Sequence, residues 1–391
     1  MRDMSRPGRL RCLLTGLLFL ALSFACADPA PVPEVPRTCL DNPVDPATVP
    51  DVPLAFATEH LDIHLDEGRY LCEGSAIEYE RFAQYVAGQL GIEIQRRIPV
   101  YLLDSNEGYC DKPSQSCVTP RGVVYSYETF IYHELTHGVA CEIRTGAPAM
   151  LAEGLAVAYD HRSNKYPGVP EDIAEIHTSE FGMYYNDAGH FVRWLLETYG
   201  TEPFVEAYRT VSYDGGVWAG LQEIYGENLE AEYEATTPAM WIQHRQCADM
   251  PVLPPDAEGN WLFSTRFDCS DEATLGPYEK DSTSFAGTTP LMFQSVIVDI
   301  EEPGLYQLQH AQYELNDQSG YLYVQVERCL DEDPATEEEI DSEWNVHFVW
   351  FTFQGGAEVE FPHPGRWRLD IGVVHGPPQD VWLQIGPRVD G

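Results

Sequence analysis

Two histidines four residues apart, His133 and His137, constrain this chain more than any other feature of its sequence. On an α-helix this spacing points both imidazoles in one direction, so that they can bind the same metal ion. Glu134 lies roughly 100° around the helix axis from His133 and would flank that ion. A hydrolytic zinc ion keeps three protein ligands and leaves its fourth position to water, so the pattern requires a third ligand.

Glu153 completes the ligand set best. From His137 the helix can run about seven residues, a rise of roughly 10 Å, to Arg144, where the sequence Thr-Gly-Ala-Pro turns the chain. The proline suits the first turn of a second helix, and Glu153 lies roughly 8 Å along it. Two antiparallel helices of these lengths return the carboxylate to the level of His137. A metzincin would instead carry Gly and His where this chain has Ala140 and Ile143.

The histidine motif together with residues 153–156 (Glu-Gly-Leu-Ala) resembles the gluzincins, the thermolysin-like and aminopeptidase-N-like zinc metallopeptidases. The resemblance covers roughly residues 55–245. It implies an α+β fold with a mixed-sheet lobe and a helical lobe. It also implies a Zn²⁺ ion bound by His133, His137 and Glu153, with Glu134 as the general base.

The same resemblance implies a tyrosine that steadies the oxyanion of the transition state. The sequence from Tyr184 to Tyr199 looks like the tyrosine-bearing helix start of the family, which makes Tyr185 the candidate and Tyr184 the reserve. His190 is a further possible donor. In gluzincins the strand before the metal helix is the sheet edge along which a peptide substrate binds, which indicates residues 123–125.

Two departures from the family pattern concern the surroundings of the metal. Thermolysin-type enzymes carry a supporting aspartate four residues after the ligand glutamate, where this chain has Val157. Asp160, two turns beyond Glu153, can take its place in part. The chain also has no counterpart of the Gly-x-Met-Glu-Asn strand with which aminopeptidases bind the substrate N-terminus. An endopeptidase is therefore favoured over an aminopeptidase.

Residues 1–27 are typical of a bacterial secretion signal. Arginines precede an apolar run over residues 13–24 that is too short for a stable membrane span. The sequence Leu-Ser-Phe-Ala-Cys resembles a lipoprotein cleavage box and predicts acylation of Cys26, although Ala-Cys-Ala also fits ordinary signal peptidase. Residues 28–53 are rich in proline and predict an extended tether. We therefore expect an exported protein, either a lipoprotein at the cell surface or outer membrane or a secreted protein.

Either cleavage leaves eight cysteines available for folding, because Cys26 is removed or acylated, and an even number in an exported chain predicts disulfides. Cys110 and Cys117 enclose a turn-rich loop and form the clearest pair. We expect Cys269 to pair with Cys329 in the C-terminal region. The four other cysteines would then crosslink the catalytic part, with their connectivity open: Cys39, Cys72, Cys141 and Cys247. Cys141 alternatively offers a thiolate one turn beyond His137 as a zinc ligand.

The formal net charge of −40 argues against a nucleic-acid partner, because a phosphate backbone would be repelled. The densest acidic run, residues 331–343, is a block of charge rather than the alternating oxygens of a calcium loop. It predicts a solvated loop.

The apolar patterns predict two folded regions, a zincin-like domain over residues 54–250 and a second domain over 251–391. In the first we expect strands over 58–65, 98–103 and 122–125 and helices over 75–90, 186–199, 202–212 and 216–246. In the second, short runs rich in Val, Tyr, Phe and Trp predict an antiparallel β-sandwich. These runs are 295–300, 304–308, 321–326, 346–351, 366–371 and 381–385. The region loosely resembles bacterial pre-peptidase C-terminal domains.

These features lead us to expect a secreted or lipid-anchored zinc endopeptidase that acts on a peptide or protein substrate. An alternative is a surface binding or adhesin-like protein that keeps the zinc fold as a scaffold. A third hypothesis is a zinc hydrolase that does not cleave peptides. The intact Glu134 favours the peptidase, because a degenerate metallopeptidase usually loses its base or a ligand first. The sequence does not predict the oligomeric state.

Overall fold

The computed structural model describes most of the chain from residue 37 onwards. The described residues are 37–41, 44–45, 48–112, 115–160, 173, 185–213, 216–235, 247, 250–278, 291–312, 321–329, 346–352 and 356–388. Three sequence predictions lie outside them: the secretion signal with Cys26, the reserve tyrosine Tyr184, and the acidic run 331–343.

A five-stranded mixed sheet forms the base of the N-terminal part, with strand order β1-β2-β3-β5-β4. The strands are β1 (Leu54–Ala57), β2 (Leu61–Leu65), β3 (Ile98–Leu102), β4 (Cys117–Val118) and β5 (Val124–Ser126). The three inner strands are parallel, and the two outer strands β1 and β4 are antiparallel to their neighbours. The prediction that residues 123–125 form the sheet edge is therefore wrong. The short strand β4 pairs with β5 and takes the edge position.

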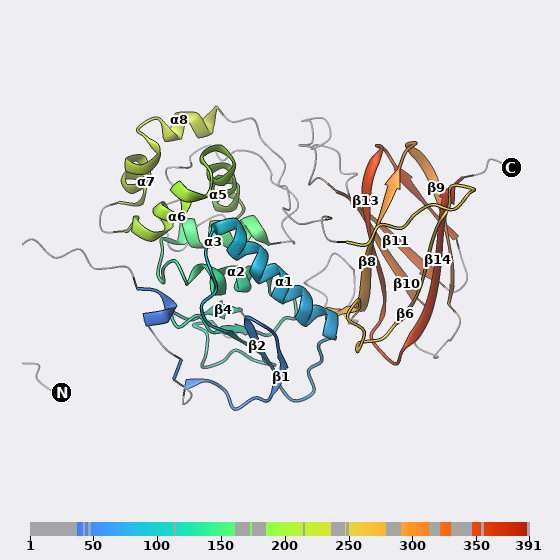
Figure 1. Ribbon diagram of the computed structural model, residues 1–391, viewed down its shortest axis with the longest axis horizontal. Coiled ribbons are helices and arrows are strands. Elements are labelled where there is room, and N and C mark those ends of the chain that lie inside the picture. Colours follow the sequence, from blue (N-terminus) through green and yellow to red (C-terminus); the bar gives the residue numbers. More distant parts are fainter. Residues whose placement is uncertain are drawn as a thin grey trace, which may run out of the picture. The chain divides into compact units, whose positions relative to one another are not determined.

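The helices of the N-terminal part lie on one side of this sheet (Figure 1). They are α1 (Glu73–Leu90), α2 (Tyr132–Ala140), α3 (Ala149–Tyr159), α5 (Tyr185–Tyr199), α6 (Thr201–Thr210), α7 (Val217–Tyr225) and α8 (Leu229–Glu234). In Figure 1 the strands lie below α1 and α2, and α5 to α8 lie beyond these helices. Most apolar positions of α1 are buried, and the helix is capped by Gly91, whose φ of 63° suits a left-handed cap. The helix expected over 216–246 is interrupted at Gly226, where φ is 110°; residues 236–246 are not described.

The hairpin of α2 and α3 carries the histidine motif. Helix α2 ends at Ala140, one turn earlier than expected, and hydrogen-bonded turns continue the chain to Arg144. Pro148 is the N-cap of α3. Gly154 lets α5 pack closely on α3, because a Cβ at this position would lie 2.6 Å from the carbonyl oxygen of Ala188. The glycine after Glu153 is therefore required by the close contact of two helices.

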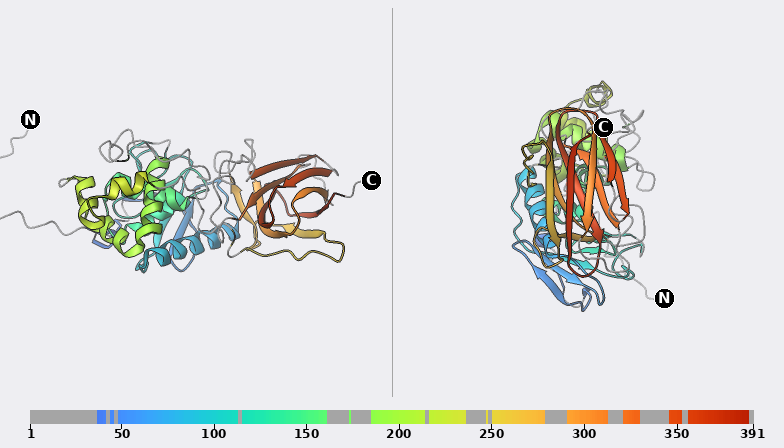
Figure 2. Two further views of the ribbon diagram at one scale, coloured as in Figure 1. Left: turned by 90° about the horizontal axis from the view of Figure 1, so that it is seen from above. Right: turned by 90° about the vertical axis from the view of Figure 1, so that its right-hand side faces the viewer.

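The C-terminal part is an antiparallel β-sandwich, as predicted. One sheet has the order β11-β10-β13-β8-β7 and the other β12-β9-β14-β6, and Figure 2 shows the two layers. Side chains from both sheets form one core, among them Phe263, Val298, Leu308, Val324 and Leu383. The strands are β6 (Trp261–Phe267), β7 (Leu275–Tyr278), β8 (Leu291–Ile300), β9 (Gly304–Gln312), β10 (Tyr321–Arg328), β11 (Val346–Thr352), β12 (Gly356–Phe361), β13 (Gly365–Val374) and β14 (Gln379–Pro387).

Four disulfides crosslink the chain, as is typical of exported proteins. The predicted pair Cys110–Cys117 is confirmed. The predicted pair Cys269–Cys329 is wrong, because Cys269 bonds to Cys72 and Cys329 to Cys247. The cause is local packing: the backbone N–H groups of Cys72 and Glu73, at the start of α1, donate to the carbonyl oxygens of Gly276 and Cys269. The segment after β6 therefore lies against α1.

The fourth disulfide joins Cys39 to Cys141 and changes our interpretation of the tether. Cys39 is buried in the short helix η1 (Cys39–Asp41). Val44, Val49 and Val52 pack against a small cluster on the other face of the sheet that includes Tyr101 and Tyr125. The described residues between 37 and 53 are thus held against the fold and do not form a free tether. No helix in the described part of the chain is long and apolar enough to span a membrane.

Candidate metal centre

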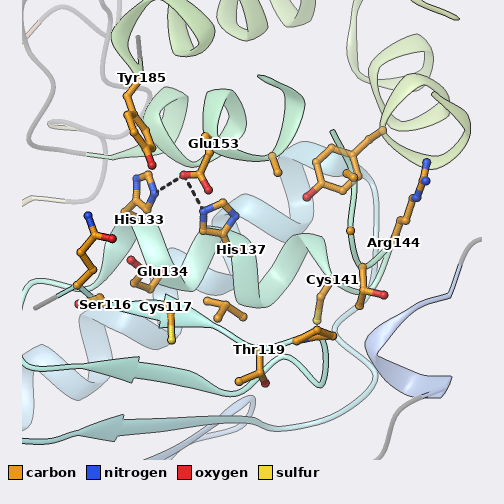
Figure 3. Close-up of a pocket in the computed structure, with 18 of the residues that line it drawn as sticks. Ser116, Cys117, Thr119, His133, Glu134, His137, Cys141, Arg144, Glu153 and Tyr185 are labelled. Carbon is orange, nitrogen blue, oxygen red and sulfur yellow. Dashed lines mark hydrogen bonds and ion pairs between the residues drawn. The ribbon is translucent and has the colours of Figure 1, made fainter. Parts of the chain in front are cut away.

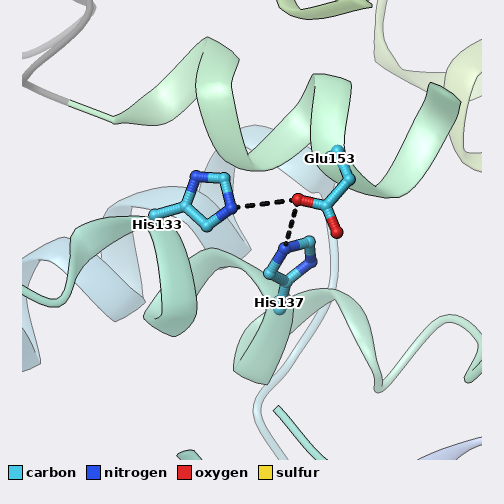
Figure 4. A group of neighbouring side chains, drawn as sticks. All are labelled: His133, His137 and Glu153. Atoms are coloured by element: carbon cyan, nitrogen blue, oxygen red, sulfur yellow. Dashed lines mark hydrogen bonds and ion pairs between the residues drawn. The ribbon is translucent and has the colours of Figure 1, made fainter. Parts of the chain in front are cut away.

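The hairpin of α2 and α3 brings His133, His137 and Glu153 together. Oε2 of Glu153 lies 3.1 Å from Nε2 of His133 and 3.3 Å from Nε2 of His137. Figure 4 shows the two imidazoles converging from α2 on the carboxylate, which descends from α3. The three residues are one of the two groups of potential metal ligands found among the described residues.

The separations of these ligand atoms fit a zinc ion. Zinc binds imidazole nitrogen and carboxylate oxygen at about 2.0–2.2 Å in a tetrahedron, which places neighbouring ligand atoms about 3.3 Å apart. The observed distances of 3.1 and 3.3 Å agree with that value. Two histidines and one glutamate are also a ligand set of catalytic zinc sites that keep an open position.

The electrostatics of the cluster favour a bound cation. Burial raises the pKa of the Glu153 carboxyl, but the two neighbouring imidazoles outweigh it and hold the pKa well below its usual range. Burial lowers the pKa of His133, yet its contact with Glu153 and the charges of Glu134 and Asp160 raise it on balance. A positive charge is therefore stabilised at this point, and a divalent ion would meet the same negative surroundings.

Asp160 lies on the side of His133 that faces away from Glu153. Its Oδ2 lies 3.9 Å from Nδ1 of His133, the ring nitrogen that does not face Glu153. Asp160 is only 5% exposed and follows the last residue of α3. Val157, in contrast, packs into the apolar core. A carboxylate behind a ligand histidine fixes the ring orientation and increases ligand basicity. Asp160 therefore lies near His133, where the sequence predicts that it substitutes in part for the family's aspartate.

A cavity of about 720 Å³ opens beside the three potential ligands. Figure 3 shows His133, Glu134, His137 and Glu153 at its wall, with Ser116, Cys117 and Thr119 of the β4 region along one side. Two loops complete the wall, residues 127–130 before α2 and residues 144–147 between α2 and α3. The edge strand β4 therefore borders the cavity along which the potential ligands lie.

Tyr185, the first residue of α5, lies at the same cavity. Its ring centroid is 6.4 Å from that of His133, and Figure 3 shows its hydroxyl directed towards His133 and Glu153. Burial raises the pKa of Tyr185, and the charges of Glu153 and Glu134 raise it further. The phenol is therefore protonated at neutral pH and can donate a hydrogen bond.

The sequence did not single out Tyr208, a buried residue of α6 that also lines the cavity. Its pKa is raised by burial and by the charge of Glu153. Tyr208 lies one turn after the buried Phe204, so its position on the helix predicts a core residue. No signal in the sequence separates it from the other buried aromatics of this part.

Two other candidates from the sequence lie elsewhere. His190 is 3% exposed, and its Nδ1 lies 2.8 Å from the hydroxyl of Tyr233 between packed helices. It does not line the cavity. Cys141 borders the cavity, but its sulfur is bonded to Cys39 and offers no thiolate.

A second group of potential ligands consists of Glu59, His60 and Glu80. The carboxylate of Glu80 already accepts hydrogen bonds from the Thr58 hydroxyl, the backbone N–H and ring of His60, and the Gln84 amide. These donors occupy both oxygens. The group therefore anchors the turn between β1 and β2 to α1, and we do not interpret it as a metal site.

Comparisons with known proteins do not define a family for this chain. No protein-family model and no curated protein sequence matches it. Among solved structures, tripeptidyl peptidase 2 matches 35% of the chain at 10% identity with a TM-score of 0.22. An isomaltodextranase of Arthrobacter globiformis matches 34% of the chain at 13% identity with a TM-score of 0.20. The chain covers 10% and 24% of these two proteins.

A third match is the periplasmic inhibitor of g-type lysozyme from Aeromonas hydrophila. It covers 35% of this chain and 96% of the inhibitor at 9% identity, with a TM-score of 0.18. These low scores establish neither a family nor an activity. The geometry of the cavity and its side chains therefore provides the basis for a functional proposal.

Proposed function

We propose that this protein is a zinc-dependent endopeptidase of the gluzincin type. The observation that carries the proposal is the position of Glu153 Oε2 within 3.3 Å of Nε2 of both His133 and His137, at the wall of a cavity that Glu134 also lines. The spacing fits a tetrahedral zinc ion with one open position. That open position would face the cavity, where a substrate can enter.

Each residue of the site has a definable role. His133, His137 and Glu153 would hold the ion, and Asp160 would keep the His133 ring in its binding orientation. When bound, zinc lowers the pKa of a coordinated water to about 7 and polarises the carbonyl of the substrate. Glu134 lies on the same helix as His133 and His137 and lines the cavity, where it would accept the proton of the attacking water and pass it to the leaving amine.

Tyr185 would donate its phenolic hydrogen to the oxygen that becomes negative in the transition state. Its raised pKa keeps that hydrogen in place at neutral pH. Removal of one such donor typically reduces turnover by about 100-fold or more. The hydroxyl direction seen in Figure 3 supports this role.

The substrate backbone would bind along β4 rather than along residues 123–125. Strand β4 pairs with β5 on one side only and ends the sheet. Its residues Cys117 and Val118 and their neighbours line the cavity. An extended peptide can add to such an edge through backbone hydrogen bonds, with alternate side chains directed into the cavity. This arrangement suits cleavage within a chain.

The place of action would be outside the cytoplasm, either on the cell surface through a lipid on Cys26 or in secreted form. The four disulfides support an oxidising compartment.

The test compares Glu134→Gln with Glu128→Gln on a library of quenched fluorescent peptides. Glu128 lines the same cavity, so its variant removes the same charge without removing the proposed base. We expect Glu134→Gln to bind zinc like the natural protein and to lose at least about 100-fold in kcat. Glu128→Gln should stay within a few-fold of the natural activity. Equal cleavage by Glu134→Gln and the natural protein would reject the mechanism. A protein that binds zinc but cleaves no peptide would favour the surface-binding alternative.

A further inference from the structure

Arg144 lies at the end of the cavity opposite to Tyr185. The residue belongs to the loop 144–147 that lines the cavity, and Figure 3 shows it beyond His137, on the side away from His133 and Tyr185. Helix and hydrogen-bonded turns carry the chain over seven positions from His137 to Arg144, a rise of roughly 10 Å. At about 3.3 Å per residue, an extended peptide covers that distance with about three residues.

The guanidinium of Arg144 is fixed by the helix beside it. Nη1 donates hydrogen bonds to the carbonyl oxygens of Arg209, at 3.1 Å, and Val211, at 2.6 Å, where α6 ends. Nε and Nη2 make no hydrogen bond to any described residue. Arginine binds a carboxylate best through two parallel donors of its rigid guanidinium. Arg144 thus keeps donors for a ligand while its side chain is held in position.

The charge around Arg144 is unusual for this chain. The sequence has 63 acidic and 23 basic residues, and other arginines such as Arg97 and Arg193 are paired with carboxylates at 2.6–2.7 Å. Among the described residues, no carboxylate lies within 4 Å of the guanidinium of Arg144. The acidic side chains that line the cavity include Glu134 and Glu153 of the metal centre. A negatively charged group of a substrate would therefore be attracted to the Arg144 end.

We infer that Arg144 recognises a carboxylate of the peptide substrate, two to three residues from the bond that is cleaved. The carboxylate is either an Asp or Glu side chain, which agrees with cleavage within a chain, or the free C-terminus of a peptide, in which case the enzyme removes a short C-terminal peptide. This inference rests on the proposed peptidase function and gives its substrate class. Tyr208 lines the same cavity. The charge of the nearby Arg144 lowers the pKa of the Tyr208 phenol, although burial raises that pKa on balance.

The experiment measures kcat/KM for matched quenched peptides. One set places Glu or Gln at the second or third residue on either side of the cleaved bond. A second set ends at the second or third residue on the C-terminal side of that bond with a free carboxylate or an amide, which separates the two sources of charge. The natural protein should prefer the carboxylate over its uncharged counterpart by about tenfold or more in one set, mainly through KM. Arg144→Gln should reduce this ratio to near one.

Arg209→Gln is the matched control. Arg209 is an exposed residue of α6 that pairs with Glu206 and does not line the cavity, so its loss removes the same charge nearby and should leave the ratio unchanged. Arg144→Lys provides a second variant if Arg144→Gln does not fold, because lysine keeps the charge but not the paired donors. It should lower the ratio several-fold.

The outcomes separate the inference from the proposed function. Cleavage with no carboxylate preference, or a preference that Arg144→Gln or Arg144→Lys retains in full, would overturn the inference and leave the peptidase assignment intact. Failure of the natural protein to cleave any peptide of either set or of a wider library would overturn the proposed function and this inference with it.

Discussion

Replacement of Asp160 by Asn tests whether the carboxylate behind His133 supports metal binding. Asp160 Oδ2 lies 3.9 Å from Nδ1 of His133 and is almost fully buried. Asparagine has nearly the same shape, so the substitution removes the negative charge and leaves the end of α3 in place. We therefore expect the fold to be retained and the affinity for zinc to fall.

The size of the effect follows from the distance and from measured precedents. Two unit charges 3.9 Å apart interact by about 4 kcal/mol at an effective dielectric constant of about 20, which is an upper value for a charge spread over a metal centre. Loss of a carboxylate behind a ligand histidine typically lowers metal affinity by about 10–100-fold, or about 1.4–2.8 kcal/mol. We expect Asp160→Asn to fall within this range.

The assay is competition for zinc against a fluorescent chelator at pH 7.5. Asp62→Asn serves as the control, since Asp62 pairs with Arg97 on β2 and does not line the cavity. A second variant combines Asp160→Asn with Val157→Asp, which places a carboxylate one turn after Glu153. Because Val157 faces the core, we expect this carboxylate not to restore the zinc affinity. An affinity of Asp160→Asn within twofold of the natural protein would refute the supporting role.

Two further predictions concern stability. Burial raises the pKa of Glu80, but hydrogen bonds from Thr58 and His60 lower it on balance. The ionised carboxylate therefore stabilises the fold at pH values above its unfolded pKa of about 4.5. This stabilisation is lost as the pH falls through the lower pKa that Glu80 has in the folded protein. Urea unfolding should show Glu80→Gln about 2–4 kcal/mol less stable at pH 7, with a smaller difference below pH 4; a difference independent of pH would contradict this. Gly74→Ala should destabilise the fold by about 1–3 kcal/mol, because its Cβ would lie 2.5 Å from the carbonyl oxygen of Thr274. Gly88→Ala in the same helix should stabilise the fold by about 0.5–1 kcal/mol, because its Cβ would meet no atom within 4 Å. Equal melting temperatures of the two variants would contradict the packing argument.

The grouping of the potential metal ligands was predictable because it depends on local periodicity. Spacing of four places His133 and His137 on one face of a helix, and a breaker sequence followed by a helix of the right length returns Glu153. The alternating strands of the sandwich were found for the same reason. Strand β6 also alternates, with Trp261, Phe263 and Phe267 buried, and the pattern was available in the sequence.

The features that the sequence did not predict depend on contacts between distant segments. Strand β4 has two residues, too few for a period, and takes the sheet edge by pairing with β5 after the loop closed by Cys110–Cys117. Cys72 and Cys269 are 197 residues apart, and their pairing follows from the packing of α1 against the segment after β6. Strand β7 contains Gly-Pro, and this local sequence argues against a strand.

The proposed activity depends most directly on a zinc ion held by His133, His137 and Glu153. Crystals of the natural protein, grown without chelator, would be measured with X-rays just above and just below the zinc absorption edge. We predict one anomalous peak per chain within about 2.0–2.2 Å of both Nε2 atoms and of a Glu153 oxygen. The absence of a peak at these residues in protein supplied with zinc, or a peak bound by other side chains, would contradict the account.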